Sequence, residues 1–341
     1  MSTTFGQCEL PRPKVLAVLP CLNEAPFLED VVSTIFAERG NIDLKIVIAD
    51  GGSVDGSREI AERLAGTSDF IDVFRNSARL QSCGVNAAVE KFGARYEYLL
   101  RVDVHAAYPK RYCETLVKEM RRIGCDSVVV SMEATGDGCF QRAAAAAQNS
   151  ILGNGGSDHR TKSTGRFVDH GHHALMSMEA FTRAGGYDPS FSQNEDAELD
   201  MRLTAAGSRI FLSRDASILY FARSTPGALF RQYRNHGIGR AKTMQKHRAR
   251  PKLRHVVLLG SIAFIVLAVL APIQPVLAIP LLIWSVSCML WGLAIGVVRR
   301  DPCAAGAGIA AVIMHFAWAL GFLEGFTKRE VHQCSPETAA T

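Results

Sequence analysis

Two long stretches near the C-terminus contain no charged residue. Val256–Val298 and Cys303–Leu323 lack Asp, Glu, Lys and Arg altogether. A helix that spans a bilayer needs about 20 predominantly apolar residues. The first stretch is long enough for two such helices, with Pro272 and Pro275 as the natural break, and the second stretch allows a third. We expect spans at about 255–273, 276–298 and 303–325, because uninterrupted apolar runs of this length are rare in soluble cores.

The third stretch is the weakest of these expected spans. It is rich in Ala and Gly and carries His315, so a re-entrant or interfacial segment is the alternative. Lys328 and Arg329 follow it. A simple three-span topology would place them outside, against the preference of basic residues for the cytoplasmic side. The side on which the tail at 327–341 lies is therefore left open.

Basic residues flank the first two expected spans. Arg299 and Arg300 follow the second, and the first is preceded by Lys242, Lys246, Arg248, Arg250, Lys252 and Arg254. Both flanks are then cytoplasmic, and so is the large N-terminal part. The net charge of +5 gathers here, which favours anionic lipid over nucleic acid as the partner. We expect 228–254 to form a basic amphipathic interfacial segment.

The N-terminus and the cysteines also point to the cytosol. Residues 1–14 lack the apolar segment that directs secretion. The nine cysteines include no CxxC pair. This pattern fits reduced thiols, and neither a disulfide framework nor a zinc cluster is expected.

Apolar runs alternate with helical patterns in the N-terminal half. Strands are expected at 14–19, 44–49 and 71–74 and in the run that leads to Asp103, and helices at 26–36, 57–65 and 81–92. Such alternation is typical of an α/β fold, a mostly parallel sheet with helices on both faces. Ligands bind such sheets beyond the carboxyl ends of the strands. Asn23, Asp50 and Asp103 stand at three such ends.

Asp103 and His105 form a candidate metal site at the end of the fourth strand. Alternate residues of an extended backbone point the same way, so one divalent ion could contact both side chains. Taken alone the pair is ambiguous, because an Asp after a strand is also a common turn residue. The sequence lacks both G-x-G-x-x-G and a Walker lysine. A bound nucleotide would therefore need a metal on its diphosphate.

Four motifs together resemble a known enzyme family. In chain order they are Pro20-x-x-Asn23-Glu24, Asp50-Gly-Gly-Ser-x-Asp-Gly, Arg101-Val-Asp103-Val-His105-Ala and Asn194-Glu195-Asp196. This order is similar to that of the family 2 inverting glycosyltransferases, which have the nucleotide-sugar-binding GT-A fold. The resemblance covers about Val15–Leu212 and continues into Phe230-Arg-Gln-Tyr-Arg. Within the family, the Arg-x-Asp-x-His-Ala form and the basic stretch are similar to the succinoglycan-biosynthesis glucosyltransferases of exopolysaccharide assembly.

The resemblance implies a donor site at the ends of the first strands. Asp50 would accept the uracil N3–H. The base and ribose would be bordered by Pro20, Asn23 and Glu24, and the donor diphosphate by Arg79 and Asn86. The alternative for Asp50 is a Gly-rich turn before a helix. The alternative for Arg79 is a solvated surface charge.

The resemblance also assigns the metal site. Asp103 and His105 correspond to the family's Asp-x-Asp element, with His in place of the second carboxylate, and Asp103 would contact the donor through the ion. The ion would be Mg²⁺ or Mn²⁺, and imidazole weakly favours Mn²⁺. Its implied role is to bridge the diphosphate oxygens and stabilise the leaving UDP.

The acidic pair Glu195-Asp196 supplies the implied catalytic base. In the family, the Asp of this pair deprotonates the acceptor hydroxyl, which attacks the anomeric carbon from the face opposite UDP. Asp196 is thus the expected base, and Glu195 and Glu198 are expected to orient the acceptor or support the structure. A helix N-terminus favours carboxylates in any case, which is the simpler explanation.

Two further groups are ambiguous. Gln232 and Arg234 resemble a Gln-x-x-Arg-Trp element that would contact the acceptor or the diphosphate, but the Arg is displaced by one and the Trp is missing. An amphipathic interfacial helix is the alternative. Metal ligation is not expected of His170, His172 and His173, which more often bind acceptor or support structure in such a loop.

The resemblance as a whole implies a multi-pass enzyme of the inner (cytoplasmic) membrane that transfers a hexose, first of all glucose, from a UDP-sugar to a polyprenyl-diphosphate-linked saccharide. A cytosolic catalytic domain at 1–227 would precede the interfacial segment at 228–254, a membrane domain at 255–326 and the tail. A processive polysaccharide synthase and an inactive nucleotide-sugar-binding membrane scaffold are the alternatives. Membrane lipids, a second copy of the chain and other exopolysaccharide assembly enzymes are the further expected partners.

Overall fold

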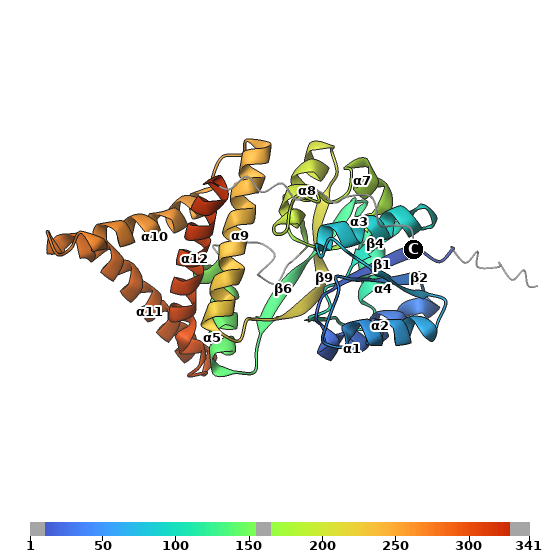
Figure 1. Ribbon diagram of the computed structural model, residues 1–341, viewed down its shortest axis with the longest axis horizontal. Coiled ribbons are helices and arrows are strands. Elements are labelled where there is room, and N and C mark those ends of the chain that lie inside the picture. The colour runs from blue at the N-terminus through green and yellow to red at the C-terminus, as the bar shows by residue number, and fades with distance from the viewer. Residues whose placement is uncertain (1–10, 155–164, 328–341) are drawn as a thin grey trace, which may run out of the picture.

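Figure 1 shows an α/β unit built around one sheet, with a group of helices packed against one end of it. The computed structural model describes residues 11–154 and 165–327. The expected tail beyond Thr327 and the first ten residues lie outside this description. The predicted α/β fold is confirmed, and its mixed sheet is parallel throughout its first four strands.

The parallel half of the sheet contains, in spatial order, β3 (Ile71–Arg75), β2 (Asp43–Asp50), β1 (Lys14–Cys21) and β4 (Tyr98–Arg101). The central strands are buried because α1 (Ala25–Phe36) and α2 (Ser57–Gly66) cover one face and α3 (Gln81–Phe92) covers the other. These elements all lie where the apolar patterns predict them. Because parallel strands end at one edge, the loops after β1, β2 and β4 meet there.

Strands from the middle of the chain complete the sheet. β8 (His172–Ser177) lies antiparallel between β4 and β6 (Ser127–Thr135), and β6 pairs in parallel with β9 (Ile210–Phe221). The short strands β5 (Ala106–Ala107) and β7 (Arg166–Phe167) also pair with β9. Antiparallel pairing brings the start of β8 beside the end of β4. The accompanying helices are η1 (Ala37–Gly40), η2 (Gly93–Arg95), α4 (Tyr112–Ile123), α7 (Met178–Arg183) and α8 (Glu195–Ala205).

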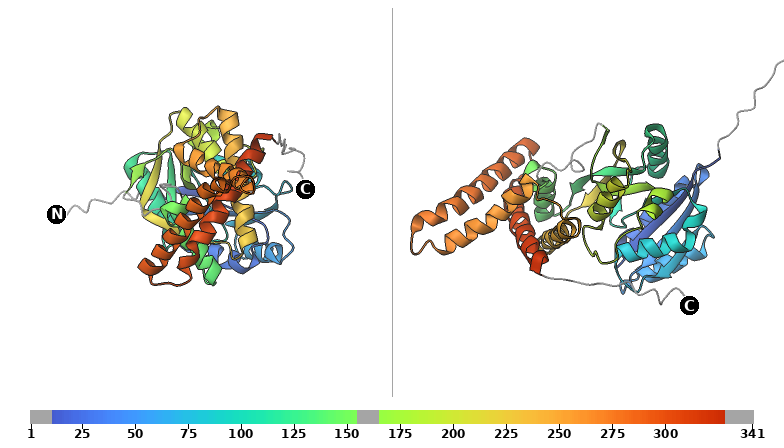
Figure 2. Two further views of the ribbon diagram at one scale, coloured as in Figure 1. Left: turned by 90° about the vertical axis from the view of Figure 1, so that its left-hand side faces the viewer. Right: turned by 90° about the horizontal axis from the view of Figure 1, so that it is seen from above.

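The helical region consists of α5 (Cys139–Gln148), α6 (Ile151–Asn154), α9 (Pro226–His247), α10 (Leu253–Val269), η4 (Pro275–Ala278), α11 (Ile279–Arg299), η5 (Ala304–Gly306) and α12 (Ala307–Thr327). Figures 1 and 2 show α9 and α12 side by side next to the sheet, while α10 and α11 form a hairpin that projects away from it. The expected interfacial segment is thus mostly the single long helix α9.

α11 and α12 differ in how much protein surrounds them. With their flanking turns they cover Pro275–Arg299 and Ala304–Thr327, and among the described residues these two helices are long and apolar enough to cross a membrane. Protein buries 17% of the most apolar part of the first but 61% of that of the second. Gly321 of α12 touches the Arg234 carbonyl of α9, and Gly237 of α9 touches the Trp318 carbonyl, so closely that an added Cβ would overlap. α12 therefore packs mainly on α9.

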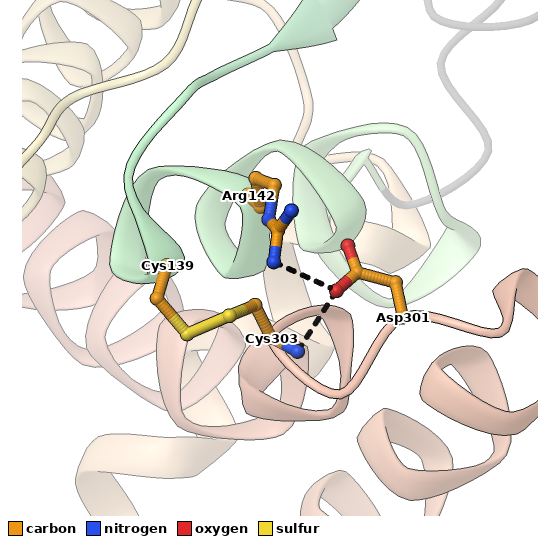
Figure 3. The surroundings of a disulfide bond; sticks show 4 residues. All are labelled: Cys139, Arg142, Asp301 and Cys303. Carbon is orange, nitrogen blue, oxygen red and sulfur yellow. Dashed lines mark hydrogen bonds and ion pairs between the residues drawn. A yellow bond between two sulfur atoms is a disulfide. The ribbon is translucent and has the colours of Figure 1, made fainter.

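The expectation of reduced thiols throughout the chain is wrong. Figure 3 shows a disulfide between Cys139, at the start of α5, and Cys303, just before η5, with the Cα atoms 5.0 Å apart. Beside it, Arg142 Nη2 lies 3.2 Å from Asp301 Oδ1. The two cysteines are 164 residues apart in the sequence. Only the packing of α5 beside η5 in the folded chain reveals the pair. Cys83 is also disulfide-bonded, and the described free thiols are Cys21, Cys113, Cys125 and Cys288.

Candidate active site

The loops after β1 and β2 hold each other at the edge of the sheet. Asn23, with a positive φ of 57°, donates its backbone N–H to Ser53 Oγ at 2.9 Å. Its side-chain Oδ1 accepts the Val54 N–H, also at 2.9 Å. The Glu24 N–H donates to Ser57 Oγ at 2.8 Å. Both loops are therefore fixed by side chains of the motifs themselves.

Asp50 closes its own loop at this edge. Its carboxylate accepts the backbone N–H groups of Gly52 at 3.2 Å and Ser53 at 3.1 Å, and the residue is only 3% exposed. The Arg79 guanidinium lies over Gly52, where an added Cβ would be 3.6 Å from Nη2. Pro20 is in register with Ala49, the residue before Asp50. The structure thus gathers most of the expected donor set, whose donor contacts stay predictions.

Asn86 lies apart from that set. Its Nδ2 donates to the Tyr187 carbonyl at 2.7 Å, and its Oδ1 accepts the Tyr187 N–H at 2.9 Å. Both ends of the amide therefore hold the chain segment that precedes α8. Asn86 is not among the residues that line the cavity described below. Its expected contact with the donor diphosphate stays a prediction.

A buried arginine joins the candidate metal site to the acidic start of α8. Arg101, 6% exposed at the end of β4, has Nη2 3.4 Å from Asp103 Oδ1 and Nη1 3.2 Å from Glu195 Oε1. The same Nη1 forms an ion pair with Asp196 Oδ1, and Nη2 donates to Gln81 Oε1 at 2.8 Å. One guanidinium thus contacts three carboxylates.

The pKa values of two acids in this cluster, Asp103 and Glu195, are shifted in opposite directions. Burial alone would raise the pKa of Asp103, but the Arg101 cation lowers that pKa to about 2. Burial and the neighbouring Asp196 carboxylate raise the pKa of Glu195 to about 7. Asp103 is therefore ionised at neutral pH, whereas Glu195 exchanges a proton close to pH 7.

Asp103 and His105 fit a divalent ion. Oδ1 of Asp103 is buried without a hydrogen-bond partner. Glu24 Oε1 lies 3.0 Å from Nδ1 of His105, which leaves Nε2 for a metal. A carboxylate on the other ring nitrogen is the usual second contact of a metal-ligating histidine. No group of three or more His, Cys, Asp or Glu residues suited to a metal occurs within 11–154 and 165–327, so other ligand atoms would have to come from the diphosphate or water.

The position of His172 was not predicted from the sequence. Its Nε2 lies 3.3 Å from Asp103 Oδ2 and its Nδ1 lies 3.9 Å from Asp196 Oδ2. Burial lowers the pKa of His172, although Asp103 and Asp196 oppose the shift. The neutral ring therefore stands between the candidate metal site and the candidate base. The histidine cluster was a signal in the sequence, but local patterns do not reveal that β8 pairs with β4.

The neighbouring histidines hold α8 in place. His173 Nε2 and His170 Nδ1 each lie 2.7 Å from a carboxylate oxygen of Asp200, and His173 Nδ1 lies 2.7 Å from Tyr187 Oη. Asp200 is fully buried, and burial would raise its pKa, but His173 and then His170 lower it to about 2. These contacts are structural, which is one of the two roles considered for His170 and His173.

One cavity of about 1260 Å³ connects the sheet to the helical region. Its lining at the sheet end includes Arg101, Asp103, His105, His172, Glu195 and Asp196. Its lining at the helical end includes Gln232, Arg240, Lys252, Arg254, Leu258, Trp284, Trp291 and Trp318. The lining thus combines acidic side chains at the sheet end with basic and apolar side chains at the helical end.

Gln232 and Arg234 take different positions. Gln232 lines this cavity, and its Nε2 donates to Tyr220 Oη at 2.7 Å. Arg234 instead pairs with Glu324 of α12, with 2.6 Å between Nη2 and Oε1, and is not among the lining residues. Of the two residues, only Gln232 is placed to contact an acceptor or a diphosphate in the cavity. That contact stays a prediction for both residues.

The parallel strands end at one edge of the sheet, where Asp50, Asp103 and the acidic start of α8 come together. This is the arrangement of a GT-A glycosyltransferase. Comparison with family models agrees: residues 16–185 match Glycosyl transferase family 2, and residues 105–322 match Glycosyl transferase family group 2. The chain belongs to glycosyltransferase family 2. The family that the four motifs predicted is thereby confirmed.

Two relatives refine this placement. The chain is 46% identical over 314 residues to the succinoglycan biosynthesis protein ExoA of Rhizobium meliloti (strain 1021), covering 92% of this chain and 95% of that protein. The predicted resemblance to the succinoglycan type is thus confirmed. A solved structure, the mannosyltransferase PcManGT from Pyrobaculum calidifontis in complex with GDP-Man and Mn²⁺, aligns with a TM-score of 0.56 at 18% identity. That alignment covers 89% of this chain and 87% of the other, and it shows a shared fold.

Proposed function

We propose that this chain is a membrane-anchored, metal-dependent inverting glycosyltransferase of exopolysaccharide assembly. It transfers a hexose, first of all glucose, from a UDP-sugar to a saccharide linked to polyprenyl diphosphate. The observation that carries the proposal is the single cavity that joins Asp103, His105 and Asp196 to the apolar walls of the helical region. A water-soluble acceptor would need no such walls, whereas a lipid-linked acceptor does. The relationship to a succinoglycan biosynthesis protein supports the role in exopolysaccharide assembly.

The donor occupies the edge formed by the first two loops. Asp50 accepts the uracil N3–H, with Pro20, Asn23 and Glu24 around the base and ribose and Arg79 and Asn86 toward the diphosphate. The hydrogen bonds between the two loops support a pocket that is formed before the donor arrives. Glu24 also contacts His105, which links the nucleoside pocket to the metal site.

Asp103 and His105 hold the divalent ion, Mn²⁺ or Mg²⁺. The buried Oδ1 of Asp103, which makes no hydrogen bond, and the available Nε2 of His105 support this role, as does the Mn²⁺ bound in the similar mannosyltransferase. When bound, the ion neutralises charge on the diphosphate as UDP leaves. The imidazole ligand favours Mn²⁺.

Asp196 removes the proton from the acceptor hydroxyl. The hydroxyl oxygen then forms a bond to the anomeric carbon on the face opposite UDP, and the bond to the UDP oxygen breaks, so the configuration inverts. The ion pair with Arg101 fixes the Asp196 carboxylate at the cavity wall. Glu195 and Gln232, which line the same wall, orient the acceptor.

The α10–α11 hairpin anchors the enzyme in the bilayer with both ends on the cytosolic side. Exposed apolar side chains of α11, such as Leu282 and Leu290, support insertion, and Arg299 and Arg300 at its end support the orientation. α12, which packs on α9, lies along the membrane surface and does not cross it. The chain after α12 then needs no further crossing to remain cytosolic, which removes the conflict raised by Lys328 and Arg329, although both lie outside the described residues.

The test measures UDP release by the detergent-solubilised full chain from a panel of UDP-sugars, with and without Mn²⁺ and with a lipid-diphosphate-linked saccharide as acceptor. Asp196→Asn should lose at least about a hundredfold in acceptor-dependent turnover, since general-base catalysis contributes roughly 10²–10⁴-fold. Glu179→Gln, at a side chain 85% exposed on α7, is the matched control and should retain full turnover. Full turnover by Asp196→Asn would overturn the assignment of the base.

The same experiment separates the two alternatives. A long polymeric product would support a processive synthase. A parent protein that binds a UDP-sugar, by calorimetry in the presence of Mn²⁺, yet releases no UDP with any acceptor would support an inactive scaffold. The retention of Asp103, His105 and Asp196 around one cavity argues against the scaffold.

A further inference from the structure

Two arginines of different helices lie near each other in the lining of the cavity. Arg240 of α9 and Arg254 of α10 both line it. Burial, and then the nearby Arg254 cation, lower the pKa of Arg240 from 12.5 to about 10. Asp200 opposes this shift, but its carboxylate oxygens are held by His170 and His173. Within residues 11–154 and 165–327, no carboxylate forms an ion pair with Arg240.

Such an arrangement favours an anion. Taking a cation out of water beside a second cation is unfavourable unless a counter-charge arrives. Lys252 lines the same part of the cavity, and its Nζ is 3.9 Å from Asp169 Oδ2 at the exposed rim. Arginine pairs are suited to phosphate oxygens because each guanidinium donates two parallel hydrogen bonds.

The position of these cations gives the order of chemical groups along the cavity. Asp200, which faces Arg240, lies one helical turn after Asp196 on α8, and residues four apart in a helix share a face. In the other direction, Arg254 is followed one turn later on α10 by Leu258, which lines the cavity with Trp284 and Trp318. The proposed base Asp196, the cations and the apolar walls therefore follow one another. A lipid-linked saccharide has the same order of sugar, diphosphate and hydrocarbon chain.

We propose that Arg240 and Arg254 bind the diphosphate of a polyprenyl-diphosphate acceptor. The saccharide then extends toward Asp196, and the hydrocarbon chain extends along Trp284 and Trp318 toward the bilayer. The inference rests on the proposed function and adds to it the site that recognises the carrier. The donor diphosphate belongs to the other end of the cavity, where His105 lies.

The first test is binding without turnover, with farnesyl diphosphate as the probe. Calorimetry in a neutral detergent should show binding to the full-length parent, at least tenfold weaker binding to Arg240→Gln, and an intermediate affinity for Arg240→Lys, which keeps the charge but not the fork. Arg63→Gln, on the far side of the sheet at an exposed pair with Glu29, is the matched control and should bind like the parent. Equal binding to parent and Arg240→Gln would overturn the proposal. So would equal displacement of the probe by phosphatidylglycerol micelles, since the site would then take lipid headgroups in general.

The second test separates carrier recognition from catalysis. The KM for a lipid-diphosphate-linked acceptor should rise at least tenfold in Arg240→Gln, while the KM for the UDP-sugar stays unchanged. Turnover on the same saccharide as a neutral alkyl glycoside should be equal in parent and variant. A loss of the same size on both acceptors would overturn the proposal, because it would mean a general structural effect. If the parent transfers only to the neutral glycoside and yet binds farnesyl diphosphate through Arg240, the acceptor of the proposed function fails while this anion site stands.

Discussion

The two ends of the cavity manage charge in opposite ways. At the sheet end, Arg101 is surrounded by Asp103, Glu195 and Asp196, so that acids outnumber the cation that joins them. At the helical end, Arg240 and Arg254 lie near each other. Acidic groups suit a metal ion and a proton acceptor. Basic groups suit the phosphates of a substrate.

The difference also concerns preorganisation. The sheet end is built from strand termini and loops that bond to one another, so its geometry exists before a ligand binds. The helical end is built from α9, α10 and α12, whose relative positions come from close contacts such as that between Gly321 and the Arg234 carbonyl. We therefore expect substitutions at the sheet end to affect catalysis and folding together, and substitutions at the helical end to affect the acceptor first.

The largest effect is expected from removing the central cation of the sheet end. Arg101→Gln leaves buried carboxylates at Asp103, Glu195 and Asp196 without their counter-charge. Removing one partner of a buried ion pair costs about 3–5 kcal/mol, so thermal unfolding in detergent should occur at a markedly lower temperature, and turnover should be lost. Arg101→Lys should recover part of the stability, since the charge remains. Parent-like unfolding of Arg101→Gln would contradict the view that this guanidinium holds the acids together.

The next largest effect concerns the metal. Asp103→Asn keeps the shape of the side chain and removes the charged ligand, so turnover should fall by roughly 10²–10³-fold, as expected when Lewis-acid stabilisation worth several kcal/mol is lost. Chelation of the parent with EDTA should give a comparable loss that added Mn²⁺ reverses. The decisive measurement is turnover against Mn²⁺ concentration in both proteins. If Asp103→Asn responds to Mn²⁺ like the parent, the assignment of Asp103 as a metal ligand is wrong.

The sheet end was largely predictable from the sequence because its chemistry lies in short motifs at the ends of local elements. The strand and helix patterns around Asp50 and Asp103 depend on neighbours in the chain, and the structure has them where they were expected. His172 was not predicted, since its position depends on β8 inserting between β4 and β6. The disulfide of Cys139 with Cys303 and the packing of α12 on α9 depend on contacts over long sequence separations. Hydropathy allowed both α11 and α12 to span the membrane, with α12 the weaker case, but it did not reveal that protein covers α12 far more than α11.

A smaller effect should come from the residue that positions His105. Glu24→Gln removes the charged partner of Nδ1 and keeps a group that can still form a hydrogen bond. Loss of such a second contact typically costs 10–100-fold in metal affinity or activity. The Mn²⁺ concentration for half-maximal turnover should therefore rise by about tenfold, with turnover recovering at saturating Mn²⁺. Glu29→Gln, at an exposed pair on α1, is the control. If saturating Mn²⁺ does not restore turnover, Glu24 acts on the donor and not through His105.

The helical end can be tested with matched glycines. Gly321→Ala places a methyl group against the Arg234 carbonyl, whereas Gly260→Ala on α10 meets nothing nearer than Phe264 at 4.0 Å. Overpacking costs about 1–3 kcal/mol, while alanine in an open helix position is favourable by about 1 kcal/mol. Gly321→Ala should lower the unfolding temperature in detergent, and Gly260→Ala should not. Equal behaviour of the two variants would mean that the α9–α12 contact does not stabilise the protein.

The smallest expected effect is a pH dependence at the sheet end. Burial and the Asp196 carboxylate raise the pKa of Glu195 from 4.5 to about 7, so the folded chain takes up a proton that the unfolded chain has already lost between these values. This contribution to stability is therefore present at low pH and declines as the pH rises toward 7 and above. Ionised Glu195 offers the acceptor hydroxyl groups a charged hydrogen-bond acceptor, so turnover should rise by up to about tenfold from pH 6 to pH 8. Glu195→Gln should flatten both profiles, measured as unfolding temperature and kcat/KM at each pH. If both pH profiles remain unchanged in Glu195→Gln, another group of the cluster causes the pH dependence.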